Sequence, residues 1–134
     1  MKFNNPDIFQ RIIEWQELKI SISNENPMVY KFFASVFINP PEELKNEIGE
    51  RYNKLSEYSH KLTLDNIDMT KFRDDIDKQK ALEIILISLN GISEKSITLY
   101  KSLTDYGYEI RNESYAKLKE YIAVLRKAFY KDGE

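Results

Sequence analysis

Apolar residues recur at helical spacing between Asp77 and Leu103, in the most apolar stretch of the chain. Steps of three and four residues predict an amphipathic helix, and this stripe is wider than one core-facing side needs. Such a helix either runs through the middle of a helical domain or meets the domain on one side and a second copy of the chain on the other. The residues that form the stripe are Leu82, Ile84, Ile85, Leu86, Ile87, Leu89, Ile92, Ile97 and Leu99.

Asn90 and Gly91 interrupt this helix near its middle. A glycine inside a helix costs about 1 kcal/mol relative to alanine, so its presence needs a reason. Three explanations are open: close packing of a neighbouring element on Gly91, a kink, or a polar group at Asn90 that faces a cavity.

The four prolines fall where other helices are expected to begin, because proline is tolerated in the first helical turn. Asn5, Asn26 and Asn39 precede them as candidate caps, and Asp77 and Asn112 are two more. These signals predict helices over residues 6–23, 27–38, 41–62, 77–103 and 113–131, with a short helical turn near residues 69–73. The predicted fold is an all-α bundle of about five main helices in a single domain, residues 1–134. The predicted inner stripe of the third helix is Leu44, Ile48, Leu55 and Leu62.

Charge and composition narrow the possible partners. Twenty Lys and Arg against 22 Asp and Glu give a net charge of −2, which argues against a domain that itself grips nucleic acid. Cysteine is absent, which excludes disulfides and thiolate sites and fits a reducing compartment. No apolar run approaches the roughly 20 residues of a membrane span, so we expect a cytoplasmic protein without membrane contact.

Side chains for catalysis are sparse. His60 is the only histidine, and it is expected to be a surface residue near a helix end. Asp74, Asp75 and Asp77 lack the alternating pattern of a calcium loop, so a solvated connection that ends in a helix cap is the better interpretation. We therefore expect neither an enzyme nor a cofactor or metal.

Three segments together resemble the C-terminal regulatory domain of TetR/AcrR-family transcriptional regulators. They are FQRIIEWQELKISIS (residues 9–23), NPMVYKFFASVFINPPEELKNEI (26–48) and LDNIDMTKFRDDIDKQKALEIILISLNGIS (64–93). The resemblance implies a helical body that binds a small molecule and dimerises, and thereby controls DNA release by a helix-turn-helix head. No such head precedes the first predicted helix. We therefore expect that this chain does not bind DNA itself, and that DNA contact requires a head domain absent from it.

The resemblance also implies which residues carry these roles. A mostly apolar effector would lie among Trp15, Phe32, Phe33, Phe37, Tyr58, Phe72, Ile85, Leu89 and Asn90. A homodimer through the last two long helices would use Ile97, Tyr100, Leu118, Ile122, Leu125 and Phe129. For each aromatic residue simple core packing is the alternative, and the last two helices could instead pack on each other within one chain. The alternative function is a stand-alone helical module that binds a partner protein.

Overall fold

The computed structural model describes residues 5–102 and 108–132, and it confirms the all-α fold. The described chain contains five α-helices and two short 3-10 turns. They are α1 (Ile8–Glu25), α2 (Pro27–Ile38), η1 (Glu42–Leu44), α3 (Lys45–Leu64), η2 (Met69–Lys71), α4 (Lys78–Ser102) and α5 (Tyr108–Phe129). The predicted ranges of the second and central helices agree with the structure within one residue at each end.

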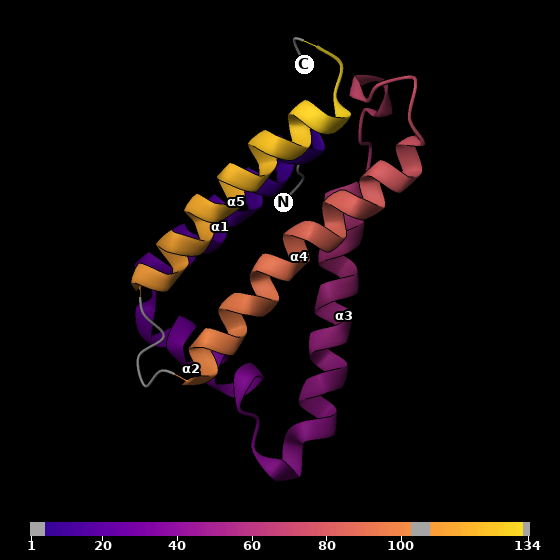
Figure 1. Ribbon diagram of the computed structural model, residues 1–134. Coiled ribbons are helices and arrows are strands. Elements are labelled where there is room, and N and C mark those ends of the chain that lie inside the picture. Colours follow the sequence, from indigo (N-terminus) through magenta and orange to yellow (C-terminus); the bar gives the residue numbers. More distant parts are fainter. Residues whose placement is uncertain (1–4, 103–107, 133–134) are drawn as a thin grey trace.

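The helices form an elongated bundle, in which different elements close the two ends (Figure 1). α1 and α5 lie side by side, and α5 also packs against α4. α3 contacts α1 and α2, and α2 crosses the end of the bundle that lies away from both termini. The connection between α3 and α4 therefore returns to the end where α1 begins and α5 finishes.

Several predicted helix boundaries are wrong because other residues form the caps. α1 begins at Ile8, where the Asp7 carboxylate accepts the N–H groups of Phe9 and Gln10. Asn39 ends α2, and a 3-10 turn delays α3 to Lys45. Asn112 lies inside α5 and caps nothing.

Asp77 does act as predicted, since its side chain accepts the N–H of Lys80 at 3.1 Å. The predicted turn near Met69 is η2, in which the Asp68 carboxylate accepts the N–H of Thr70. Both caps satisfy donors that the first turn of a helix leaves without a partner.

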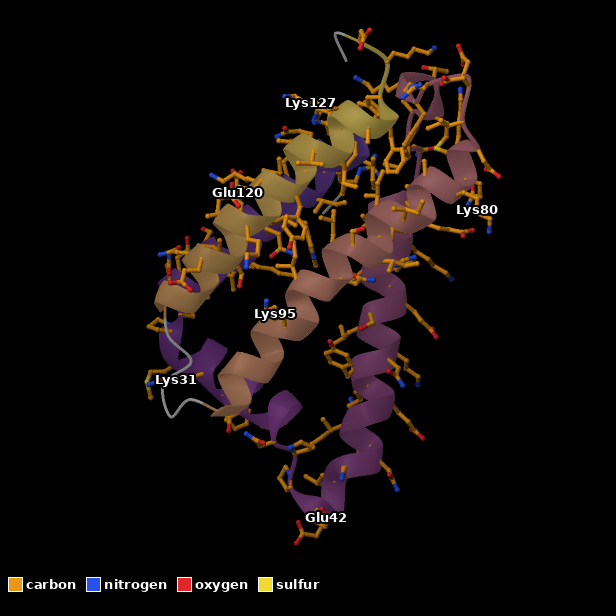
Figure 2. The ribbon with its side chains drawn as sticks, viewed as in Figure 1. Lys31, Glu42, Lys80, Lys95, Glu120 and Lys127 are labelled. Carbon is orange, nitrogen blue, oxygen red and sulfur yellow. The ribbon has the colours of Figure 1, made fainter. Side chains whose placement is uncertain are left out.

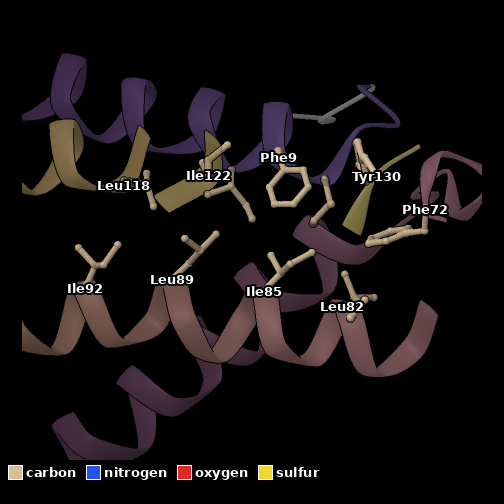
Figure 3. Close-up of a cluster of buried hydrophobic side chains, with 12 residues drawn as sticks. Phe9, Phe72, Leu82, Ile85, Leu89, Ile92, Leu118, Ile122 and Tyr130 are labelled. Atoms are coloured by element: carbon tan, nitrogen blue, oxygen red, sulfur yellow. The ribbon is translucent and has the colours of Figure 1, made fainter. Parts of the chain in front are cut away.

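One apolar cluster joins α1, α4 and α5 (Figure 3). Side chains of α4 at steps of three and four point toward α5 and toward Phe9 of α1, as the periodicity of the sequence predicts. Burial of a side chain of this size contributes about 1.5–3 kcal/mol, so this cluster is the main source of stability. It contains Ile8, Phe9, Ile12, Phe72, Ala81, Leu82, Ile85, Leu89, Ile92, Leu118, Ile122 and Tyr130.

The predicted inner stripe of α3 is only partly buried. Ile48 is buried, whereas Leu44 and Leu55 are exposed. Likewise Ile84 and Ile87 of α4 face outward, with Ile87 72% exposed. The surplus apolar face of α4 is therefore not covered by the described part of this chain.

A buried carboxylate ties the start of α1 to the end of α5. Asp7 accepts hydrogen bonds from Arg126 Nη1 at 2.8 Å and from the Tyr130 hydroxyl at 3.0 Å. Burial alone raises the pKa of Asp7, but the hydrogen bond and charge of Arg126, with the Tyr130 hydroxyl and the Gln10 N–H, hold it below its usual 3.8. Burial and the Asp7 charge raise the pKa of Tyr130.

Backbone pairing at the same end holds the α3–α4 connection against the end of α5. Phe72 and Tyr130 form an isolated antiparallel bridge, in which Arg73 N–H donates to Phe129 and Lys131 N–H donates to Lys71. The Tyr130 ring meets the rings of Phe9 and Phe72 edge-on, with centroids 4.9 and 5.0 Å apart. Edge-to-face pairs of this kind add about 0.5–1.5 kcal/mol each beyond the burial of their area.

A buried arginine closes α3. Arg11 of α1 is 1% exposed, and its guanidinium donates to the carbonyl of Asn5 and to the carbonyls of Leu62, Thr63 and Asp65 at the end of α3. The last carbonyls of a helix lack partners within it and carry partial negative charge, so a cation is favourable there. Asn66, in the left-handed region with φ of 58°, then turns the chain away.

Charged side chains cover the outside of the bundle. Figure 2 shows Lys80, Glu120 and Lys127 on the periphery, and all three are exposed. Among the described helices, none combines the length and the apolar character that crossing a membrane requires.

Asp7→Asn is expected to lower the free energy of unfolding at pH 7 by about 1.5–3 kcal/mol, because Asn keeps the cap but loses the charged hydrogen bond to Arg126. The pKa of Asp7 is depressed in the folded state, so its contribution is present above pH 3.8 and is lost as pH falls from there through the lowered pKa. Urea unfolding of both proteins at several pH values should therefore show the difference shrinking in acid. The exposed Asp75→Asn is the control and should cost less than about 0.5 kcal/mol. Equal stability of Asp7→Asn and the unaltered chain at pH 7 would contradict this role.

Arg11→Met is expected to cost about 1–3 kcal/mol, because it leaves buried carbonyls at the end of α3 without a donor. Hydrogen exchange should also accelerate in the last turn of α3 more than in α5. Arg51→Met is the matched control, since Arg51 forms only an exposed pair with Glu47, and it should change stability by less than about 0.5 kcal/mol. If the two variants are equally stable, Arg11 is not a structural cap.

Candidate functional site

A cleft of about 380 Å³ lies between α1, α3 and α4, with one residue of α5 at its base. Each helix contributes one face, because the lining positions recur at steps of three and four residues. Ile12, Leu89 and Leu118 make an apolar floor that is continuous with the core, and the other lining residues are largely polar or aromatic. The cleft is lined by Ile12, Trp15, Gln16, Lys19, Tyr52, Ser56, Ser59, His60, Thr63, Leu86, Leu89, Asn90 and Leu118.

The structure brings together three of the predicted effector-binding residues. Trp15 of α1 and Leu89 and Asn90 of α4 all line the cleft. Close packing on Gly91 does not explain the break in the apolar stripe, since no described residue lies within 4 Å of where its Cβ would be. Asn90 does line the cleft, as the explanation of a polar group that faces a cavity requires, and a kink stays an open alternative.

The remaining predicted effector residues lie elsewhere. Phe72 and Ile85 are fully buried in the core, as the alternative of simple packing has it. Phe32 and Tyr58 are each 63% exposed and lie outside the cleft lining. The side chains of Phe33 and Phe37 lie outside the described part of the structure.

Sequence reasoning missed the polar wall of the cleft. Tyr52, Ser56, Ser59 and Thr63 form one stripe of α3 along the cleft, with Ser59 and Thr63 half-buried and Tyr52 and Ser56 exposed, while Leu55 lies outside the lining. The spacing of this stripe was visible in the sequence, but its small hydroxyl residues resemble a solvated face.

Lys19 is the only cationic side chain among the described lining residues. Its Nζ lies 5.1 Å from the centroid of the Trp15 ring, one helical turn away on α1, in a cation–π arrangement. Although Lys19 keeps exposed surface, desolvation of its ammonium lowers its pKa.

The cleft suits binding better than catalysis. His60 lines it beside Ser56 and Ser59, yet no Asp or Glu is among the described lining residues to orient the imidazole. No group of three or more His, Asp or Glu in the described parts of the chain is arranged to hold a metal ion. An apolar floor with a few polar groups and a volume in the range of about 300–1,000 Å³ is the usual form of a small-molecule site.

A second space of about 520 Å³ runs between α1 and α5, but it is an open groove on the surface. Glu17 and Glu25 lie along it, and the Tyr115 hydroxyl donates to Glu17 at 2.6 Å. Desolvation and the nearby Glu17 raise the pKa of Tyr115 to about 12. We favour the smaller cleft because three helices enclose it over a core-lined floor.

The residues predicted for a dimer interface have other positions in the single chain. Leu118 and Ile122 are each 4% exposed in the core between α4 and α5, and Leu125 and Phe129 pack beside them. The side chains of Ile97 and Tyr100 lie outside the described residues. The faces of these two helices that stay open are formed by Ile84, Ile87, Tyr121 and Val124.

Comparison with known proteins found no matching family model, no matching curated protein and no matching solved structure. The similarity to TetR/AcrR regulators therefore remains a prediction drawn from the three sequence segments.

Proposed function

We propose that the chain is a small-molecule-sensing and dimerisation domain of the kind found in TetR-like transcriptional regulators. The observation that carries the proposal is the cleft between α1, α3 and α4, which combines an apolar floor with an aromatic wall and polar anchors. Its effector is a small, mostly apolar molecule that stacks on Trp15 and is oriented by groups such as Asn90. DNA would be controlled through a separate helix-turn-helix head.

α4 connects the cleft to the rest of the domain. Its residues Leu86, Leu89 and Asn90 line the cleft, while Leu82, Ile85 and Leu89 pack in the core against α1 and α5. A ligand that displaces α4 therefore changes how α4 meets α5. A packed helix that shifts between two arrangements is a known means of coupling two sites.

The dimer in this proposal uses the outward faces of α4 and α5. Ile84 and Ile87 on α4, with Tyr121 and Val124 on α5, expose apolar surface that a second copy would cover. Leu118 and Ile122 would support this surface from beneath.

A second candidate function is a helical module that binds a partner protein. Exposed apolar residues on α2 and α3 favour it: Met28, Val29 and Phe32 on α2 and Leu55 and Tyr58 on α3. An apolar helix of a partner could lie along such a surface.

Native mass spectrometry of the purified chain tests the first proposal. We expect a species that carries a small adduct, which leaves on gentle activation, because the cleft has an apolar floor that a mostly apolar molecule would cover. A chain with no adduct, whose Trp15 signals do not respond to a library of small aromatic molecules, would favour the protein-interaction module.

Two substitutions separate the dimer surface from the core. Ile87→Glu places a charge on an exposed face, so it should convert dimer to monomer in sedimentation experiments with little loss of helix content. Leu118→Glu buries a carboxylate in the core and should unfold the chain at a denaturant concentration well below normal, with a loss of several kcal/mol. If the unaltered chain sediments as a monomer at micromolar concentration, the proposed dimer does not form and the exposed faces of α4 and α5 have another role.

A further inference from the structure

We infer that the cleft binds an organic anion, namely a small aromatic carboxylic acid in its ionised form. The inference rests on the proposed small-molecule function and specifies the chemical class of the ligand. It goes beyond a mostly apolar effector, because it assigns the charge of the ligand and the residue that recognises it.

The charged side chain that lines the described cleft is positive. Lys19 contributes a positive charge, and none of the described lining residues is an Asp or Glu. The chain as a whole carries a net charge of −2 and is rich in carboxylates, so a wall without them is unusual for its surface. By contrast, the groove between α1 and α5 is bordered by Glu17 and Glu25. An anion is therefore favoured in the cleft and disfavoured in the groove.

Lys19 is positioned for a ligand that is partly apolar. In the described structure, no carboxylate forms an ion pair with Lys19, and its ammonium lies against the Trp15 ring at 5.1 Å. The cleft has already removed part of the water from this charge, which lowers the pKa of the amine. A carboxylate placed beside Nζ gives the ammonium a charged partner, and a charge-assisted hydrogen bond is stronger than one between neutral groups.

The other lining groups suit the rest of such a molecule. The Trp15 and Tyr52 rings and the floor at Leu89 accept a flat apolar ring. Gln16 and Asn90 carry amide N–H groups at the sides of the cleft, so they can donate to a second carboxylate oxygen or to a ring substituent. Among the described lining residues a cationic ligand would find neutral acceptors without a carboxylate, and it would be repelled by Lys19.

A matched pair of probes tests the inference on the full chain. 1-Naphthoate and 1-naphthamide share one ring system and differ mainly in charge. The chain has a single tryptophan, Trp15, so a ¹⁵N-labelled sample gives one indole N–H cross-peak that reports on the cleft directly. We expect 1-naphthoate to shift this peak saturably and to bind about tenfold more tightly than 1-naphthamide, the difference typical of one charged hydrogen bond.

Variants of Lys19 identify the group responsible. Lys19→Gln should remove the preference for naphthoate while leaving naphthamide binding unchanged, and Lys19→Arg should retain the preference because it keeps the charge. Lys127→Gln, which removes an exposed charge far from the cleft lining, should leave both affinities unchanged. Circular dichroism of each variant confirms that it is folded.

The other outcomes are distinct. If both probes shift the Trp15 peak with equal affinity, the cleft is a small-molecule site but the anion inference is overturned. A naphthoate preference that survives in Lys19→Gln overturns the role of Lys19. If neither probe moves the Trp15 peak, or naphthoate binds only elsewhere, both the inference and the proposed sensing site are contradicted.

Discussion

The Asp7 carboxylate is the interaction on which the arrangement of the helices depends. It starts α1 as its cap, and it accepts hydrogen bonds from Arg126 and Tyr130, which lie 119 and 123 residues later. A buried carboxylate is tolerated only when its lone pairs are satisfied, so α1 and α5 have to lie alongside each other with their ends aligned. Tyr130 also holds the α3–α4 connection in place, because its backbone forms the antiparallel bridge with Phe72. Because this connection leads directly into α4, its attachment to α5 fixes where α4 enters the core.

Buried contacts are consequently concentrated at one end of the bundle, and exposed apolar side chains at the other. Buried aromatic rings, backbone pairing and the Arg11 cap all lie near the start of α1, whereas α2 and the middle of α3 leave large apolar side chains exposed. The cleft lies between these two regions, with a floor supplied by the core and one wall supplied by the less covered α3. The base of the cleft is therefore part of the buried core, whereas its α3 wall is more exposed to solvent.

Periodicity predicted the helices well and their partners poorly. The α4 stripe of Leu82, Ile85, Leu89 and Ile92 is buried as its spacing required, and Asp77 caps that helix. The spacing of apolar residues says which face is buried but not against which helix, so Leu118 and Ile122 were assigned to a second copy and are found in the core. Asp7 and Arg11 were missed because their partners lie far along the chain, and the cleft wall was missed because hydroxyl residues resemble a solvated surface. Trp15, Leu89 and Asn90, which the resemblance to TetR/AcrR regulators indicated, do line the cleft, and their binding of a ligand stays a prediction.

The long separation between Asp7 and its partners also bears on how the chain folds as it is made. α1 is synthesised before α5, so the buried carboxylate of Asp7 lacks its two native partners until Arg126 and Tyr130 have been made. Closing so long a loop costs conformational entropy, and this cost is offset only when the distant contact forms. The native packing of α1 is therefore completed only once α5 has been made, and not progressively from α1 onward. During that interval α1 and α4 expose their apolar faces, which are the surfaces that a chaperone would bind.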